Sequence, residues 1–122
     1  MSNLSKILVV EDSPILLLDL CDQLEELGYT PVSATTAGTG ARLIDATITA
    51  MITDIELGDG PDGLALARVA SQARPGLPIV VVSGGVTPTA ADLPAGAIFV
   101  PKPYTLEAIL DALHRQEMAA AA

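Results

Sequence analysis

Residues 50–54 read Ala50-Met51-Ile52-Thr53-Asp54, a short apolar run that ends on a carboxylate. Three further runs have the same form and are followed by polar residues: Lys6–Val10 before Glu11-Asp12, Ile79–Val82 before Ser83, and Ala97–Val100 before Pro101-Lys102. Runs of this length, separated by helical stretches, are typical of buried parallel strands in an α/β sheet. Because ligands gather outside the carboxyl ends of such strands, these polar residues should meet at one edge, where they could bind a divalent cation and a phosphoryl group.

Composition excludes several classes of protein. The 122 residues are enough for one domain with a core that needs no disulfide or structural metal. Fifteen acidic residues against six basic ones give a net charge of −9 without a basic cluster, so we expect no direct binding to nucleic acid. No apolar run is long enough to span a membrane and no secretory signal is present, which predicts a cytoplasmic protein without membrane contact. The single cysteine, Cys21, falls among leucines at helical spacing and is expected to be buried and inert.

Strand and helix signals alternate along the chain. The pattern predicts helices and strands at these residues: strand 6–10, helix 14–27, strand 30–34, helix 37–46, strand 49–54, helix 64–73, strand 79–82 after Pro78, strand 97–100 and a last helix capped by Thr105. Between the last two strands, Gly84, Gly85, Pro88 and Pro94 leave room for at most about two helical turns. The order is (βα)5 with a shortened or missing fourth helix, and residues 118–122 are expected to form a disordered or fraying tail.

The polar residues that follow the apolar runs resemble those of a known family. Glu11-Asp12, Asp54 with Gly63 in the next loop, Ser83-Gly84 and Lys102-Pro103-Tyr104 are similar in order and context to the receiver domains of two-component response regulators. The resemblance covers essentially the whole chain, residues 1–122, and is greatest to short single-domain receivers of alphaproteobacteria, through the runs 62–68 and 93–104. It implies a flavodoxin-like, doubly wound parallel sheet of five strands.

The resemblance and the chemistry of the side chains imply a role for each site residue. Asp54 would be the phosphoacceptor, and Lys102 and Ser83 would contact the phosphoryl oxygens. Mg²⁺ would be held by Asp12, Asp54 and the backbone carbonyl of Glu56, with Glu11 acting through water. The Lys102-Pro103 peptide bond is expected to be cis.

The family resemblance also implies how the signal enters and leaves. The phosphoryl donor would be a sensor histidine kinase or a histidine phosphotransfer protein, docking on Ile15, Leu16 and Leu18; alternatively, these side chains only widen the contact with the core. The switch residues would be Ser83 and Phe99, and an unidentified protein would read their movement. We expect a monomer whose residues 84–95 are mobile until phosphorylation, and not an enzyme that acts on a separate substrate.

Other interpretations of the sequence remain open. A stand-alone protein is the favoured interpretation, and the alternative is the receiver segment of a hybrid histidine kinase. The run Asp54-Ile55-Glu56 superficially resembles the paired acids of phosphatases and phosphotransferases with a strand-end aspartate nucleophile, although no cap domain is present. A receiver-like binding module without phosphorylation is disfavoured by the intact acid set. Taken singly, Glu11-Asp12 could be a solvated loop, Ser83 a turn residue and Lys102 a surface charge, and His114 is expected to be solvated.

Overall fold

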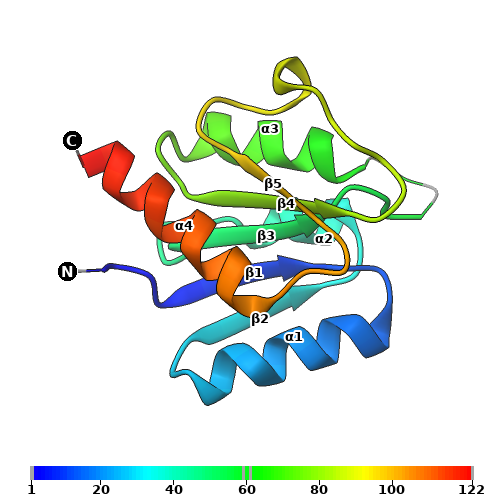
Figure 1. The fold of residues 1–122 in the computed structure, drawn as a ribbon, viewed down its shortest axis with the longest axis horizontal. Helices are drawn as coiled ribbons and strands as arrows, with labels where there is room; N and C mark the ends of the chain where they lie inside the picture. Colours follow the sequence, from blue (N-terminus) through cyan, green and yellow to red (C-terminus); the bar gives the residue numbers. More distant parts are fainter. Residues whose placement is uncertain (1, 59, 61, 122) are drawn as a thin grey trace.

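One parallel sheet forms the centre of the molecule, with two helices on each face (Figure 1). The computed structural model describes residues 2–58, 60 and 62–121. The strands are β1 (Lys6–Val10), β2 (Thr30–Ala34), β3 (Ala50–Asp54), β4 (Ile79–Ser83) and β5 (Ile98–Pro101), in the spatial order β2-β1-β3-β4-β5. The helices are α1 (Pro14–Glu26), α2 (Ala37–Leu43), α3 (Gly63–Ala73) and α4 (Leu106–Ala121). The predicted fold class is confirmed.

The apolar strands supply both faces of the core. Ile7 and Val9 point into the cluster that contains residues of α1 and α4, whereas Leu8 and Val10 point into the cluster that contains residues of α2 and α3. This alternation follows from the two-residue repeat of a strand. Every residue of β3 and β4 is buried, as expected for central strands covered on both sides.

Helix α1 begins and ends close to the predicted residues. Pro14 occupies its first turn, and Leu17, Leu20 and Leu24 form its buried stripe. The helix ends before Gly28, whose positive φ of 91° favours glycine. Ser13 takes the capping position, but its side chain makes no cap hydrogen bond. Cys21 is buried, in agreement with its predicted place in the core.

Helix α2 is shorter than predicted, because it ends at Leu43 rather than near Ala46. The side chain of Asp45 accepts a hydrogen bond from the backbone N–H of Thr47 at 2.8 Å, and Arg74 donates to the backbone carbonyls of Asp45 and Ile48. A local carboxylate turn of this kind competes with helical hydrogen bonding and directs the chain toward β3.

Two predictions concern the second half of the chain, the missing fourth helix and the disordered tail, and only the first is confirmed. Between β4 and β5 the only helical element is one 3₁₀ turn, Ala90–Asp92, so the fourth helix of the repeat is missing as expected. The tail prediction differs from the structure, because α4 continues through Ala121; alanine is the residue with the highest helix propensity. The last residue of the predicted tail, Ala122, lies outside the described residues. No helix in the described part of the chain is long and apolar enough to cross a membrane.

Candidate functional site

The carboxyl ends of β1, β3 and β5 bring three charged side chains together. Lys102 Nζ lies 2.9 Å from Glu11 Oε1 and 3.0 Å from Asp54 Oδ2. Backbone hydrogen bonds continue the sheet past the strand ends, with Glu11 N–H donating to Ala34 O at 3.1 Å and Lys102 N–H donating to Ser83 O at 2.9 Å. The predicted convergence of these residues at one sheet edge is therefore what the structure shows.

Both carboxylate oxygens of Glu11 accept hydrogen bonds. Oε1 accepts from Lys102, and Oε2 accepts from the backbone N–H of Ser13 at 3.1 Å. Burial raises the pKa of Glu11, but the hydrogen bonds from Lys102 and Ser13 outweigh burial and leave the pKa below its usual value. For Lys102, burial lowers the pKa and the two carboxylates more than compensate, so its pKa is raised. This pair is charged at neutral pH.

Asp54 has one paired and one unpaired oxygen. The residue is only 4% exposed, and its Oδ1 has no hydrogen-bond partner. Burial raises the pKa of Asp54 to about 6; the Lys102 hydrogen bond opposes this rise, and the charge of Glu11 adds to it. A buried carboxylate oxygen without a donor is costly, and a cation or a covalent modification would relieve that cost.

The acidic residues around Asp54 are close enough to hold a metal ion. Ligand atoms of Glu11, Asp12 and Asp54 all lie within 4.8 Å of one another. Asp12 is exposed, and its pKa is raised, first by burial and then by its interaction with Glu11. Three crowded carboxylates of this kind form a set of hard oxygen ligands suited to Mg²⁺.

Gly63 supports the position of Asp54 from the start of α3. A Cβ atom at residue 63 would lie 1.8 Å from the backbone carbonyl oxygen of Asp54 and 2.9 Å from Thr53 Oγ1. The Gly63 N–H donates to Ile55 O at 2.8 Å, and Asp62 caps the helix by accepting from Ala65 N–H at 2.9 Å. Only glycine allows the helix to approach the end of β3 this closely.

Ser83 lies at the end of β4, where its hydroxyl group makes three hydrogen bonds. Its Oγ donates to Glu56 Oε1 at 2.6 Å and accepts from the backbone N–H groups of Gly85 and Val86 at 3.2 and 2.9 Å. The hydrogen bond from Ser83 is the largest cause of the lowered pKa of Glu56. The sequence predicted a role only for the backbone of Glu56, and the side-chain contact was missed because spacing alone does not reveal where a loop carboxylate points.

The remaining site predictions concern β5 and the residues after it. The Lys102-Pro103 peptide bond is cis, as predicted. Phe99 is half-buried against the cluster between the sheet and helices α2 and α3, in the same region as Leu93 and Ala97. It therefore lies beside the segment that replaces the fourth helix.

The apolar residues of α1 proposed for docking are exposed. Ile15 is 81% exposed, Leu18 62% and Leu16 43%, so they do not widen the core contact. Leu16 lines an open hollow of about 650 Å³ together with Lys102, Pro103 and Tyr104. This surface therefore adjoins the strand-end cluster.

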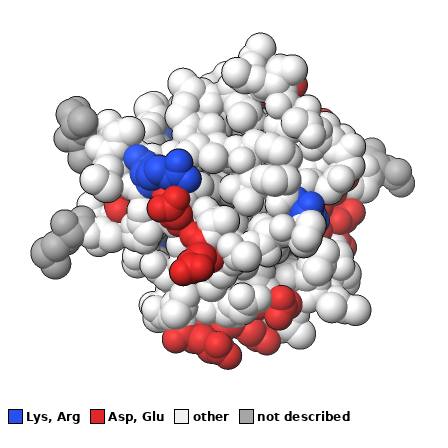
Figure 2. All heavy atoms as spheres, in the orientation of Figure 1, with Lys and Arg blue, Asp and Glu red and all other residues white. Residues whose placement is uncertain are grey.

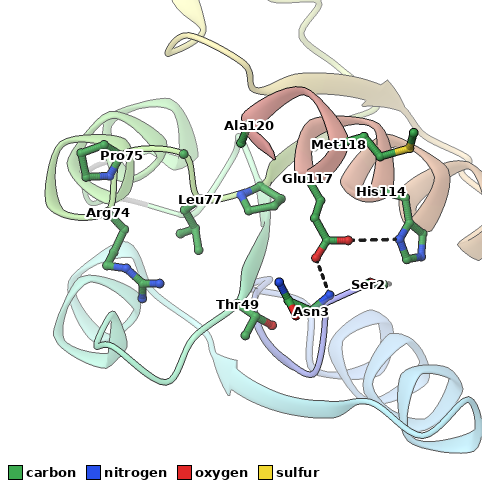
Figure 3. Close-up of a pocket in the computed structure, with 12 residues that line it drawn as sticks. Ser2, Asn3, Thr49, Arg74, Pro75, Leu77, His114, Glu117, Met118 and Ala120 are labelled. Carbon is green, nitrogen blue, oxygen red and sulfur yellow. Dashed lines mark hydrogen bonds and ion pairs between the residues drawn. The ribbon is translucent and has the colours of Figure 1, made fainter. Parts of the chain in front are cut away.

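A larger hollow, of about 920 Å³, lies at the amino ends of the strands, opposite the strand-end cluster. It includes Thr49 and Pro78, which precede β3 and β4 (Figure 3). Glu117 accepts from Asn3 N–H at 2.6 Å and lies 3.7 Å from His114 Nδ1. The Arg74 guanidinium group donates hydrogen bonds to backbone carbonyl groups of the loop before β3. These contacts connect α4 to the start of the chain, and they place His114 beside Glu117 rather than in the strand-end cluster.

Comparisons with known proteins agree with this geometry. The family profile described as "Response regulator receiver domain" matches residues 7–114. The response regulator receiver protein from Sinorhizobium medicae WSM419 is 29% identical, with a TM-score of 0.88 over 97% of this chain and 98% of its own. The receiver domain protein from Methanospirillum hungatei JF-1 is 31% identical, with a TM-score of 0.79 over 96% of this chain and 99% of its own. The Sinorhizobium structure is in keeping with the expected alphaproteobacterial similarity. No curated protein matches the sequence.

Proposed function

This chain belongs to the response regulator receiver family of two-component signalling, and we propose that it accepts a phosphoryl group on Asp54 and signals by a change of conformation. The observation that carries this proposal is the environment of Asp54. One of its oxygens is paired with Lys102 at 3.0 Å, and the other is buried without a partner beside two further carboxylates. A nucleophile, a cation and a set of metal ligands therefore stand together.

The proposed reaction is a transfer from phosphohistidine. A carboxylate oxygen of Asp54 attacks phosphorus, the O–P bond forms as the P–N bond breaks, and the electron pair of that bond returns to the imidazole nitrogen. The product is an aspartyl phosphate. Water later attacks this acyl phosphate slowly, which releases inorganic phosphate and restores the carboxylate.

The residues around Asp54 would offset the negative charges of the carboxylate and the phosphoryl group in this step. Lys102, which already bridges Glu11 and Asp54, supplies a positive charge to the phosphoryl oxygens. Asp12, Asp54 and the backbone carbonyl of Glu56 would hold Mg²⁺, with Glu11 acting through water. When bound, Mg²⁺ neutralises the repulsion between the carboxylate and the incoming phosphoryl group.

The donor would be a sensor histidine kinase or a histidine phosphotransfer protein, and we place its docking surface on α1. Ile15, Leu16 and Leu18 are exposed there, next to the hollow that Lys102 lines. The rest of the exposed face of α1 is acidic and includes Asp19, Asp22, Glu25 and Glu26. Figure 2 shows this red patch below the sheet, where Figure 1 draws α1. A partner with an apolar centre and basic side chains around it would complement this surface.

In this role the protein would act in the cytoplasm as a monomeric phosphoacceptor switch, and not as an enzyme with a separate substrate. Intact-mass measurement after incubation with Mg²⁺ and acetyl phosphate tests it directly. One added phosphoryl group is expected on the wild-type protein and none on Asp54→Asn, which keeps the size of the side chain but removes the nucleophile. Labelling of Asp54→Asn at the wild-type level, or no labelling of the wild type, would contradict the assignment.

A further inference from the structure

The hydroxyl group of Ser83 has no free hydrogen-bonding capacity. A serine hydroxyl carries one proton and two lone pairs. In this structure the proton is directed to Glu56 Oε1 at 2.6 Å, and the lone pairs accept from the N–H groups of Gly85 and Val86. Ser83 is 2% exposed, so water is not an easy substitute for these partners.

The proposed function requires this same proton. When Asp54 carries a phosphoryl group, Ser83 must donate to a phosphoryl oxygen, and one proton cannot serve two acceptors. We propose that the Glu56 side chain is a competing acceptor, which holds Ser83 in its unphosphorylated arrangement and must release it before Ser83 can contact the phosphoryl group. This inference rests on the proposed function and assigns a positioning residue to it.

The surroundings of Glu56 support this assignment. A Cβ atom at residue 85 would lie 3.3 Å from Glu56 Oε1, so glycine at this position leaves room for the Glu56 carboxylate. An ionised carboxylate is a stronger acceptor than a neutral group, which suits a contact that must compete with a phosphoryl oxygen. Glu56 is itself exposed, so it can swing into solvent when the contact breaks.

Release of Ser83 would also affect the segment between β4 and β5. The N–H groups of Gly85 and Val86 both use Ser83 Oγ as their acceptor. If the hydroxyl turns toward a phosphoryl group, these N–H groups must find other partners. The contact with Glu56 therefore connects the site to the start of the segment that replaces the fourth helix.

The first experiment uses the unphosphorylated, metal-free protein. Amide hydrogen exchange at Gly85 and Val86 should become about three- to tenfold faster in Glu56→Leu, because Ser83 loses the acceptor that fixes it. Unchanged exchange at these two amides would overturn the proposal. This readout does not depend on phosphoryl transfer, so it stays separate from a failure of the proposed function.

The second experiment measures the affinity for beryllofluoride in Mg²⁺. Glu56→Leu should bind about three- to tenfold more tightly than the wild type, and the same substitution in a Ser83→Ala background should have no effect, as a double-mutant cycle would reveal. Glu56→Gln, which keeps an acceptor oxygen but loses the charge, should fall between Glu56→Leu and the wild type. An equal gain in affinity in Glu56→Gln and Glu56→Leu would show that Glu56 acts through its charge and would refute the proposal. A gain in affinity that persists in the Ser83→Ala background would refute it as well, because Glu56 would then act without Ser83.

Discussion

Gly63 approaches the carbonyl oxygen of Asp54 so closely that a Cβ atom at residue 63 would lie 1.8 Å from it. The start of α3 and the end of β3 therefore pack together without room for a side chain at residue 63. The position of Asp54 depends on this contact as well as on the sheet.

Gly63→Ala should therefore destabilise the protein strongly. The clash is with backbone, which cannot move aside without displacing β3 or α3, and we expect a loss of about 2–4 kcal/mol in the free energy of unfolding. Urea denaturation measures it. Gly60→Ala, in the loop that precedes α3 and with nothing within 4 Å of its Cβ position, is the matched control and should change stability little. Equal stability of the two variants would contradict this account.

The raised pKa of Asp54 predicts how stability depends on pH when no metal is present. Burial raises this pKa from its ordinary value of 3.8 to about 6, so the folded state holds the proton more tightly than the unfolded state. The stability that this proton contributes is complete below the unfolded pKa and is lost as the pH rises through about 6.

Asp54→Asn should remove the loss of stability that accompanies deprotonation of Asp54. At pH 7.5 in a chelator, the variant should be more stable than the wild type by on the order of 1–3 kcal/mol, since a change of one in pKa corresponds to about 1.4 kcal/mol. The difference should shrink toward zero near pH 4. Denaturation curves at a series of pH values measure it, and a variant less stable than the wild type at neutral pH would show that the pair with Lys102 outweighs burial.

Asp12→Asn should weaken Mg²⁺ binding by about tenfold or more, because it removes one charge from the set of three carboxylates. Calorimetric titration with Mg²⁺ measures the change, and the rise in melting temperature on adding Mg²⁺ should decrease in parallel. Asp22→Asn, an exposed acid in the middle of α1, is the control. The prediction is wrong if both variants keep the wild-type affinity.

Replacing Leu16 and Leu18 with serine should impair phosphotransfer from a histidine kinase by about tenfold or more, while labelling by acetyl phosphate stays unchanged. The comparison separates docking from chemistry, because the small donor needs no docking surface. Val69, which is 47% exposed on α3, offers a control for the loss of a surface apolar side chain. Undiminished transfer to a folded Leu16→Ser, Leu18→Ser variant would refute the docking role.

Phosphorylation, or beryllofluoride, should increase the protection of residues 84–95 from hydrogen exchange, while the protein stays monomeric. In the structure this segment holds only the 3₁₀ turn Ala90–Asp92, whose capping contacts are confined to Thr89 and Asp92 and to a hydrogen bond from Arg68 to the Asp92 carbonyl. Light scattering would detect a dimer. Dimerisation abolished by substitutions in residues 86–92 would contradict the prediction.

Most of the site could be predicted from sequence because its residues follow apolar runs directly. Glu11, Asp54 and Ser83 each take the place at which a buried strand ends, and parallel strands bring such places to one edge. Contacts that depend on how loops turn were not foreseeable in this way. The spacing of Asp54 and Gly63 is part of the family resemblance, but the close approach that requires glycine at residue 63 is a contact between two elements that only the structure shows. The hydrogen bond from Ser83 to Glu56 also joins two separate elements, and no spacing in the sequence indicates it.

The hydrogen bond from Asn3 N–H to Glu117 has a practical consequence for engineering. It holds the residue that leads into β1 beside the last turns of α4, at the sheet edge opposite Asp54 (Figures 1 and 3). A circular permutant that joins these two regions through a short peptide would not have to cross the face that carries Asp54. For the same reason, a fluorescent protein or an immobilising tether fused at either end would stand clear of the surface around Asp54 and of the proposed docking residues on α1.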